Sequence, residues 1–345
     1  MFKHNTLGIR LFIRKLLYFV LIQGCIWIAV LAVYIRYETV NPEGFGKGYL
    51  AATIDKHNRL AQLPSPRIVF VGGSNLPFGL DSARIENSLG HNTVNMGLDL
   101  SLGLDFMLRE IEPFLARGDV VVISPEYEQY IDMYPGKVTS LFSEVTNYPR
   151  ALQFLSHKHF ALFLDQGFLL IGGITRAAIR FATQGVSSEQ HPTSPYVRAA
   201  FNEYGDITRH HDLRRRDITI RQFAPISPDS ITRVIDRLNQ FSDHCRSEGI
   251  AVFYSYPPIF RGQLQAYAKM IDEIASNLTE RLNFPILDTP EEMSFTADYM
   301  FDHEYHLTFA GKQIRTNQLI TTLQKKLMNP EDTSDFTGPG ILSAH

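Results

Sequence analysis

The side chains that could perform chemistry lie in two short segments, one in the first third of the chain and one near its end. Ser74 follows the apolar run from Ile68 to Val71 and a Gly-Gly turn, so its hydroxyl is expected where a buried strand ends. Asp302 and His306 come shortly before a helical pattern. A serine hydroxyl becomes a good nucleophile when a histidine takes its proton and a carboxylate orients that histidine. The residue types therefore predict a Ser74–His306–Asp302 triad that attacks a carbonyl carbon.

Each segment also has a plain structural interpretation. A Gly-Gly-Ser-Asn turn needs no chemistry, and Asp302 and His306 could serve as a helix cap and a loop histidine. His303 is an alternative base, but it is closer to Asp302 along the chain and lacks the His-Leu-Thr context of His306. The joint placement of serine, histidine and aspartate in one domain favours the catalytic interpretation.

The elements that would position these residues alternate between strands and helices. Such alternation implies a parallel sheet covered by helices on both faces, with ligands at the carboxyl ends of the strands. The expected fold class is α/β, a three-layer doubly wound parallel sheet with a large insertion at 128–226 after the third strand. Strands are expected at 67–72, 93–96, 120–124, 250–258 and 284–290, and helices from about 81, 104, 229, 264 and 308.

The N-terminal part carries an uncharged apolar segment from Leu16 to Ile35, which has about the length that crosses a hydrocarbon core. Basic residues precede it and mixed charges follow, so the positive-inside rule places the N-terminus in the cytoplasm and the rest outside. A cleaved signal peptide would need a small-x-small site, and a buried core helix would carry a polar face. The expected organisation is a cytoplasmic N-terminus (1–15), a transmembrane anchor (16–35), a linker (36–66), the α/β domain (67–327) and a disordered tail (328–345).

A second apolar stretch, Phe160 to Ile179, contains Asp165 and three glycines. We expect a buried or membrane-facing helix pair here. A second span is not expected, because it would place Ser74 and His306 on opposite sides of the membrane.

Composition narrows the classes of function. The formal net charge of −3 gives no excess of positive charge for nucleic acid. Cys25 lies in the apolar segment and Cys245 in the globular part, so no disulfide is expected between them. The spacing of His303 and His306 is not completed by further ligands, so no metal is expected. No phosphate-binding or dinucleotide-binding glycine motif is present, so no cofactor is expected.

Three blocks of this chain resemble those of the SGNH/GDSL-like hydrolases and acyltransferases, whose fold is flavodoxin-like. GGSN at 72–75 resembles the serine block, and NMG at 95–97 resembles the glycine block. DHEYHLTFAG at 302–311 resembles the terminal Asp–His block, with one residue more than the usual spacing. This longer spacing resembles that of membrane-anchored relatives whose genes lie beside genes for bacterial cell-surface polymers. The resemblance implies that the N–H groups of Ser74 and Gly97 hold the oxyanion.

The third block of that family, Gly-x-Asn-Asp, is missing. Ser124-Pro125-Glu126-Tyr127 stands in its place, and an ionised glutamate cannot donate a hydrogen bond. Either another asparagine supplies the donor, or the enzyme is weak or inactive. The candidate oxyanion and substrate-binding residues are Gly73, Asn75, Asn95, Gly97 and Asn202.

The segment from 128 to 226 adds many aromatic residues and the basic run from Arg209 to Asp217. The aromatic residues could form a sugar-binding platform or the core of the segment itself. The basic run could be a solvated face or a contact to an anionic glycan or to lipid headgroups.

These observations predict a membrane-anchored extracytoplasmic serine acyl-esterase or O-acyltransferase. Its substrate would be the acyl groups of a cell-surface or exported polysaccharide, with acetyl as the first candidate. For a transferase, the resemblance implies a membrane-bound O-acyltransferase partner that supplies the acyl group. The alternative is a catalytically inactive, membrane-tethered glycan-binding or assembly component of a polysaccharide export complex.

Overall fold

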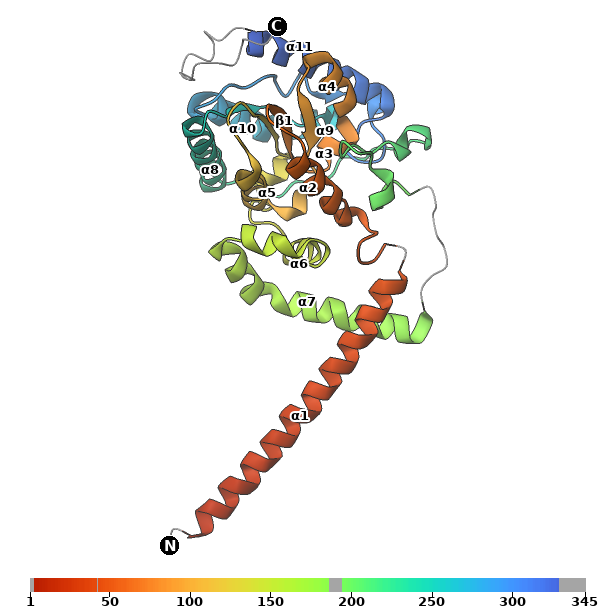
Figure 1. Cartoon of the computed structure of the whole chain (residues 1–345), viewed down its shortest axis with the longest axis vertical. Coiled ribbons are helices and arrows are strands. Elements are labelled where there is room, and N and C mark those ends of the chain that lie inside the picture. The colour runs from red at the N-terminus through yellow and green to blue at the C-terminus, as the bar shows by residue number, and fades with distance from the viewer. Residues whose placement is uncertain (1–2, 42, 186–193, 329–345) are drawn as a thin grey trace.

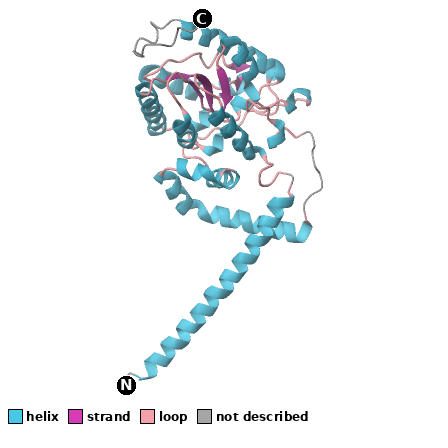
Figure 2. Ribbon diagram, viewed as in Figure 1, coloured by secondary structure: helices cyan, strands magenta, loops and turns pink. Residues whose placement is uncertain are grey.

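A parallel four-stranded sheet lies at the centre of the domain (Figure 2). This computed structural model describes residues 3–41, 43–185 and 194–328. The strands are β1 (Arg67–Gly72), β2 (Asn92–Asn95), β3 (Val120–Ser124) and β4 (Ala251–Tyr254), in the spatial order β2-β1-β3-β4. The register pairs Gly72 at the end of β1 with Ser124 at the end of β3. The carboxyl ends of the two central strands therefore meet at one edge of the sheet.

Helices cover both faces of this sheet. Val69 and Val71 of β1 pack into a core formed with α5 (Leu104–Ile111), α8 (Pro228–Ser247) and α10 (Ala268–Arg281). On the opposite face, Ile68 and Phe70 pack against α4 (Ser82–Leu89) and α11 (Phe309–Met328). The expected α/β class and parallel sheet are confirmed. The alternating apolar side chains of β1 are all buried because both faces are covered.

The turn that carries the nucleophile candidate leads from β1 into two short helices. Ser74 is the N-cap of α3 (Asn75–Gly79), and Asp81 caps α4 by accepting a hydrogen bond from the N–H of Arg84. Gly90 ends α4 in the left-handed conformation, with φ of 68°. The described short elements are η1 (Tyr49–Ala52), η2 (Leu100–Leu102), η3 (Glu112–Phe114), η4 (Tyr127–Tyr130), η5 (Pro149–Phe154), η6 (Arg198–Ala200), η7 (Arg209–Asp212), η8 (Ala297–Tyr299) and α9 (Arg261–Ala266).

The expected strand at 284–290 is reduced to a single bridge between Tyr254 and Ile286. The segment contains Pro285 and Pro290, which have no N–H to donate to a sheet ladder. A separate two-stranded parallel pair forms nearby in the chain, from β5 (Ile259–Phe260) and β6 (Ser294–Phe295). The prediction of a regular fifth strand was therefore wrong.

The expected linker at 36–66 is largely helical and packed against the domain. Helix α1 (Lys3–Val40) extends beyond the apolar segment, and α2 (Thr53–Gln62) follows η1. Thr53, Lys56 and Leu60 of α2 are buried, so this helix belongs to the folded core. The expected disordered tail lies outside the described residues, apart from Met328 at the end of α11.

The second apolar stretch forms one continuous helix, α7 (His157–Gln184), and not a pair. It follows α6 (Val138–Asn147) and runs across the C-terminal end of α1 beneath the domain (Figure 1). The three glycines of α7 have no neighbouring atoms where a side chain would begin, so they cost helix propensity without breaking the helix. By length and composition, α1 from Gly8 and α7 are the two described helices that could cross a membrane.

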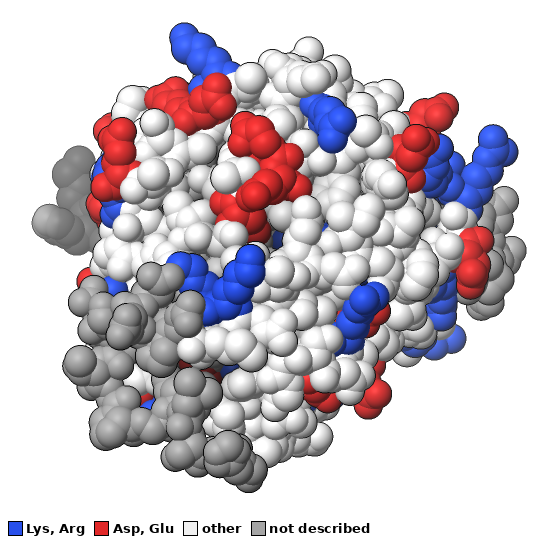
Figure 3. Space-filling model, turned by 90° about the horizontal axis from the view of Figure 1, so that it is seen from above, with Lys and Arg blue, Asp and Glu red and all other residues white. Residues whose placement is uncertain are grey.

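The face of the molecule opposite α1 carries acidic and basic side chains side by side (Figure 3). No field of one sign dominates the part of this face that is described, which agrees with the net charge of −3. The expectation that the chain does not bind nucleic acid stays a prediction.

Candidate active site

The three predicted catalytic side chains meet in the structure. Ser74 Oγ lies 2.9 Å from Nε2 of His306, and Nδ1 of His306 lies 2.9 Å from Oδ1 of Asp302. A carboxylate only accepts hydrogen bonds, so Nδ1 carries the proton and Nε2 is left to accept from the Ser74 hydroxyl. His306 and Asp302 are almost fully enclosed, whereas Ser74 is only half-buried. This is the arrangement in which histidine can take the serine proton.

Two aromatic residues hold His306 and Asp302 in place. The ring of Phe78 stacks on the His306 imidazole, with ring centroids 3.9 Å apart and an interplanar angle of 11°. The hydroxyl of Tyr196 donates a hydrogen bond of 2.6 Å to Oδ2 of Asp302. Burial raises the pKa of Asp302, but the hydrogen bonds from His306 and Tyr196, with the charge of His306 when it is protonated, outweigh burial and lower that pKa. Asp302 therefore stays ionised and can stabilise an imidazolium.

Neither aromatic residue was identified from the sequence. Phe78 follows the serine turn by a few residues and reads as an ordinary apolar position of a short helix. Tyr196 lies in the aromatic-rich segment, where nothing distinguished it from its neighbours. Its role depends on a contact across 106 residues of chain, which no local pattern encodes.

His303, the alternative base, is occupied elsewhere. Its Nε2 contacts Arg221, and its ring lies against that of His306, with centroids 4.7 Å apart. Burial and the positive charges of His306 and Arg221 lower its pKa to about 3, so it stays neutral beside the triad. The structure therefore favours His306 as the base.

The expected oxyanion donor Gly97 is engaged by a neighbour. Its N–H donates to Oδ1 of Asn95 at 3.0 Å, and Nδ2 of Asn95 donates to Asp206 at 2.8 Å. A Cβ at Gly97 would lie 2.9 Å from the carbonyl oxygen of Gly73, so only glycine lets this loop approach the serine turn so closely. Gly97 and Asn95 thus shape the site, but neither presents a free donor as predicted.

The N–H of Ser74 remains as a donor. None of the hydrogen bonds among the described residues uses this N–H. Because it belongs to Ser74 itself, it would lie close to a carbonyl group attacked by the Ser74 hydroxyl.

Asn75 turns inward and is not a substrate-facing donor. Its Nδ2 donates to the carbonyl oxygen of Ser124 at 2.8 Å, and its Oδ1 accepts from Arg315 at 3.1 Å. Arg315 is fully buried and also donates to the Asn75 carbonyl oxygen at 2.8 Å. Burial lowers the pKa of Arg315 to about 10, so it remains a cation. The prediction that Asn75 faces the substrate is therefore wrong.

Arg315 was missed by sequence reasoning, although a signal existed. It occupies the same face of α11 as Leu319 and Leu323, which are buried in the core. An arginine on the apolar stripe of a helix must find buried acceptors. Here those acceptors are the backbone and side chain that follow the nucleophile.

Glu126 lies directly beneath the serine turn. Its Oε1 accepts the N–H of Asn75 at 3.0 Å, whereas its buried Oε2 has no partner among the described residues. A Cβ at Gly73 would lie 2.2 Å from Oε2, which explains the glycine before the nucleophile. Burial raises the pKa of Glu126 to about 7, so a neutral carboxyl group is accessible near neutral pH.

Asn202 serves its own turn. Its Oδ1 accepts the N–H groups of Tyr204 and Asp206, at 3.0 and 2.9 Å. The carboxylate of Asp206 in turn accepts from Ser82 and Asn95, which ties this turn to α4 and β2. Asn202 therefore stabilises its own turn, and neither of these two hydrogen bonds involves the triad.

Part of the basic run from Arg209 to Asp217 is packed into the protein. Arg209 donates to the carbonyl oxygen of Ala199, and the buried His210 contacts that of Leu307. Burial lowers the pKa of His210 to about 2 and that of His211 to about 4. Neither histidine adds positive charge at neutral pH, which weakens the interpretation of the run as an anion-binding surface.

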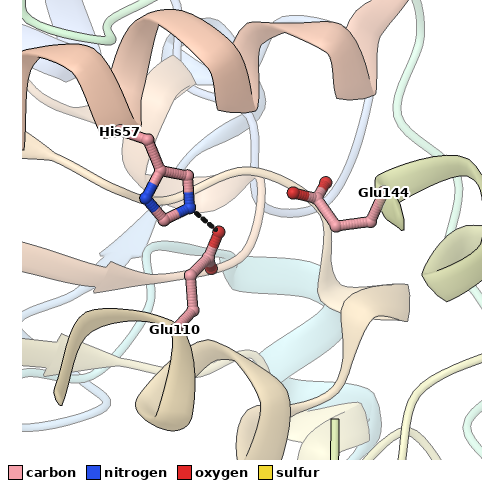
Figure 4. A group of neighbouring side chains, drawn as sticks. All are labelled: His57, Glu110 and Glu144. Atoms are coloured by element: carbon pink, nitrogen blue, oxygen red, sulfur yellow. Dashed lines mark hydrogen bonds and ion pairs between the residues drawn. The ribbon is translucent and has the colours of Figure 1, made fainter. Parts of the chain in front are cut away.

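One group of side chains could hold a metal ion, contrary to the sequence expectation. Among the described residues, His57, Glu110 and Glu144 bring their ligand atoms within 4.8 Å of one another (Figure 4). The three residues come from α2, α5 and α6, so no short spacing in the sequence reveals them. The hydrogen bond within this group joins His57 to Glu110 and does not involve the triad.

Comparison with known proteins does not assign the chain to a family. No protein-family model matches it, and a search of curated proteins finds no significant match. The functional assignment therefore rests on the geometry of the site and on the resemblance of its sequence blocks.

Proposed function

We propose that this chain is a serine acyl-esterase or O-acyltransferase of the SGNH type. The observation that carries the proposal is the continuous hydrogen-bonded path from Tyr196 through Asp302 and His306 to Ser74. The strand order β2-β1-β3-β4, with serine after β1 and the Asp–His block before α11, supports the same class.

In the proposed mechanism, Ser74 Oγ attacks the acyl carbonyl carbon while its proton passes to Nε2 of His306. The carbonyl oxygen becomes an oxyanion, and Asp302 stabilises the imidazolium. Collapse of this intermediate breaks the ester bond, and the leaving oxygen takes the proton from Nε2. Water or a sugar hydroxyl then gives its proton to Nε2 and attacks the acyl carbon of the acyl-enzyme. Collapse of this second intermediate breaks the bond to Ser74 Oγ, which takes the proton back from Nε2. Attack by water is hydrolysis, and attack by a sugar hydroxyl is transfer.

Two groups are proposed to stabilise the oxyanion. The first is the N–H of Ser74. The second is Glu126, which stands after β3 where the resemblance expects an asparagine and which becomes a donor only when neutral. Glu126→Gln keeps a neutral donor, so we expect it to retain more activity than Glu126→Ala.

We place the activity at a membrane surface outside the cytoplasm. The uncharged segment of α1 and the basic residues before it support a single anchor with a cytoplasmic N-terminus. The proposed substrate is an acylated cell-surface or exported polysaccharide. A membrane-bound O-acyltransferase is the proposed acyl source if the reaction is transfer.

The second candidate function is a membrane-tethered glycan-binding component without catalysis. The engaged Gly97 N–H and the absence of an asparagine after β3 favour it, because loss of one oxyanion donor costs about 10²–10³ in rate. The intact hydrogen bonds of the triad argue against it.

Hydrolysis of p-nitrophenyl acetate by the full-length protein in detergent tests the proposal. We expect turnover by the wild type and by Ser247→Ala, which changes an exposed serine of α8, and at least about a 10³-fold loss in Ser74→Ala. Equal rates in Ser74→Ala and Ser247→Ala would remove Ser74 from catalysis. If all three proteins fold but none hydrolyses p-nitrophenyl acetate or an acetylated polysaccharide, the second candidate function, glycan binding without catalysis, is favoured.

A further inference from the structure

We propose that His57, Glu110 and Glu144 bind a divalent first-row transition-metal ion inside the domain, with Zn²⁺ and Mn²⁺ as the leading candidates (Figure 4). Nε2 of His57 already lies 2.8 Å from Oε1 of Glu110. The carboxylate of Glu144 points toward this pair from α6 in Figure 4. One imidazole and two carboxylates form a ligand set that suits these ions better than Ca²⁺, which takes six to eight oxygens.

The burial of these groups is the second observation. Glu144 is fully buried, and both of its carboxylate oxygens lack a hydrogen-bond partner among the described residues. The hydroxyl of Thr53, also buried on α2, lacks one as well. A buried carboxylate without a partner costs several kcal/mol. A divalent ion with two carboxylates and a neutral imidazole is electrically neutral, which removes this cost.

The proposed ion would have a structural role. Its ligands join α2 and α5 to α6, the first helix of the segment that follows β3. The ring of Tyr148, at the end of α6, stacks on His57 with centroids 4.2 Å apart, so the imidazole is already fixed in orientation. A buried ion at this site would stabilise the fold, with a water molecule in the fourth tetrahedral position that the three protein ligands leave.

Elemental analysis of the full-length protein, purified without chelator, tests the metal proposal. We expect about one ion per chain in the wild type and in the surface control Glu280→Gln, and at least about a tenfold loss of bound metal in Glu144→Gln. A chelator should lower the Tm of the wild type and leave that of Glu144→Gln unchanged. If Glu144→Gln does not fold, loss and recovery of Tm on chelation and Zn²⁺ or Mn²⁺ addition to the wild type decide the matter.

A wild-type protein that contains no stoichiometric metal and gains no Tm with Zn²⁺ or Mn²⁺ would overturn the proposal. Glu144→Gln would then be at least as stable as the wild type, because a neutral side chain suits a dry pocket that holds a protonated glutamate.

The exposed apolar side chains of α7 lead to a second inference. We infer that α7 lies flat in the outer interface of the membrane that α1 crosses, which rests on the proposed membrane anchor. Leu164 is 89% exposed and Phe168 68% exposed, so an apolar face of α7 has no cover within the described chain. Other exposed apolar residues of α7 are Phe160, Leu169, Ile171 and Ile179. So large an exposed apolar face on one helix marks an interaction surface.

The position of α7 identifies the occupant of this surface as lipid. The exposed apolar residues of α1 continue to Ile35, and α7 meets α1 immediately afterwards, where Tyr37 contacts Phe181 with ring centroids 5.9 Å apart. Figure 1 shows α7 running across α1 and beneath the domain, not along α1. A helix at this height and in this direction lies at the boundary between headgroups and acyl chains.

Quenching of tryptophan fluorescence by brominated lipids tests this placement in liposomes. Trp27 is the only tryptophan of the chain, so the wild type reports on α1 alone. In a Trp27→Phe background, we expect quenching of Leu164→Trp and none of Met328→Trp, which labels the end of α11 on the far side of the domain. Quenching of Trp27 without quenching of Leu164→Trp would overturn the placement of α7. An unquenched Trp27 would instead contradict the anchor.

Discussion

At the scale of single residues, the candidate site is a hydrogen-bonded series of four polar side chains, in which those of Asp302 and His306 are almost fully buried. Tyr196 and His306 both hydrogen-bond to Asp302, and His306 reaches Ser74. The two hydrogen bonds to Asp302 keep its carboxylate ionised, which orients the imidazole. Tyr196 acts through Asp302, so it is a positioning residue.

Removal of the Tyr196 hydroxyl should weaken the base. In Tyr196→Phe we expect kcat to fall about 10- to 100-fold with little change in KM, because a hydrogen bond to a charged group contributes about 1.5–3 kcal/mol. The matched control is Tyr204→Phe, which removes a hydroxyl that binds Glu86 away from the triad. Equal kinetics in the two variants would show that Tyr196 does not position Asp302.

Glu126 should make stability depend on pH. Its pKa in the folded protein is raised to about 7 from 4.5 by burial, so the folded state favours the neutral carboxyl. The neutral Glu126 carboxyl contributes about 3 kcal/mol to the free energy of unfolding. This contribution is complete below about pH 4.5, and it is lost as pH rises through about 7. We therefore expect Glu126→Gln to gain stability relative to the wild type from pH 5 to pH 8 in urea unfolding. Parallel pH profiles for the two proteins would contradict this pKa.

At the scale of elements, the site depends on the close approach of the turn after β1 to the end of β3. Gly73 lies against the Glu126 carboxyl, and Arg315 of α11 fixes Asn75 from the other side. The turn that carries Ser74 is thus held by Glu126 after β3 and by Arg315 of α11, neither of which belongs to the proposed triad.

A methyl group on this turn should disturb it. Gly73→Ala places a Cβ 2.2 Å from Glu126 Oε2, so we expect a loss of about 1–3 kcal/mol in unfolding free energy together with reduced activity. Gly172→Ala is the matched control, because no atom lies within 4 Å of its Cβ position in α7. It should be neutral or slightly stabilising. A Gly73→Ala protein as stable and active as Gly172→Ala would refute the close packing described here.

The elements were predictable where local pattern determines them. The runs of β1 and β3 are short, apolar and β-branched, and their ends agree with the structure. The sequence does not predict the continuity of α7, because its three glycines indicate breaks, whereas the helix runs through all of them. The expected fifth strand failed because its prolines cannot sustain a ladder.

The site was predictable where residue type alone suggests chemistry. Ser74, Asp302 and His306 meet as expected. The direction of Asn75 and Asn95 could not be predicted, because it depends on Arg315 and Asp206 from distant segments. Sequence pattern identifies reactive groups, but tertiary partners decide which of them remain free.

At the scale of the whole molecule, the structure relates the candidate active site to the proposed membrane. Helix α1 leaves the domain at the side where α7 lies, whereas α11 lies at the opposite end of the molecule (Figure 1). In this arrangement α7 would lie between the bilayer and the α/β domain, so the sheet would not contact the membrane surface. A polymer substrate on the outer side of the membrane fits this arrangement.

The central claim is that Ser74 is a nucleophile activated by His306. The most direct measurement is reaction of the full-length protein with a fluorophosphonate, followed by peptide mass spectrometry to locate the adduct. We predict one adduct on Ser74, no adduct in Ser74→Ala, and labelling at least about 10²-fold slower in His306→Ala. An adduct on another serine, or equal labelling of Ser74 without His306, would contradict the account.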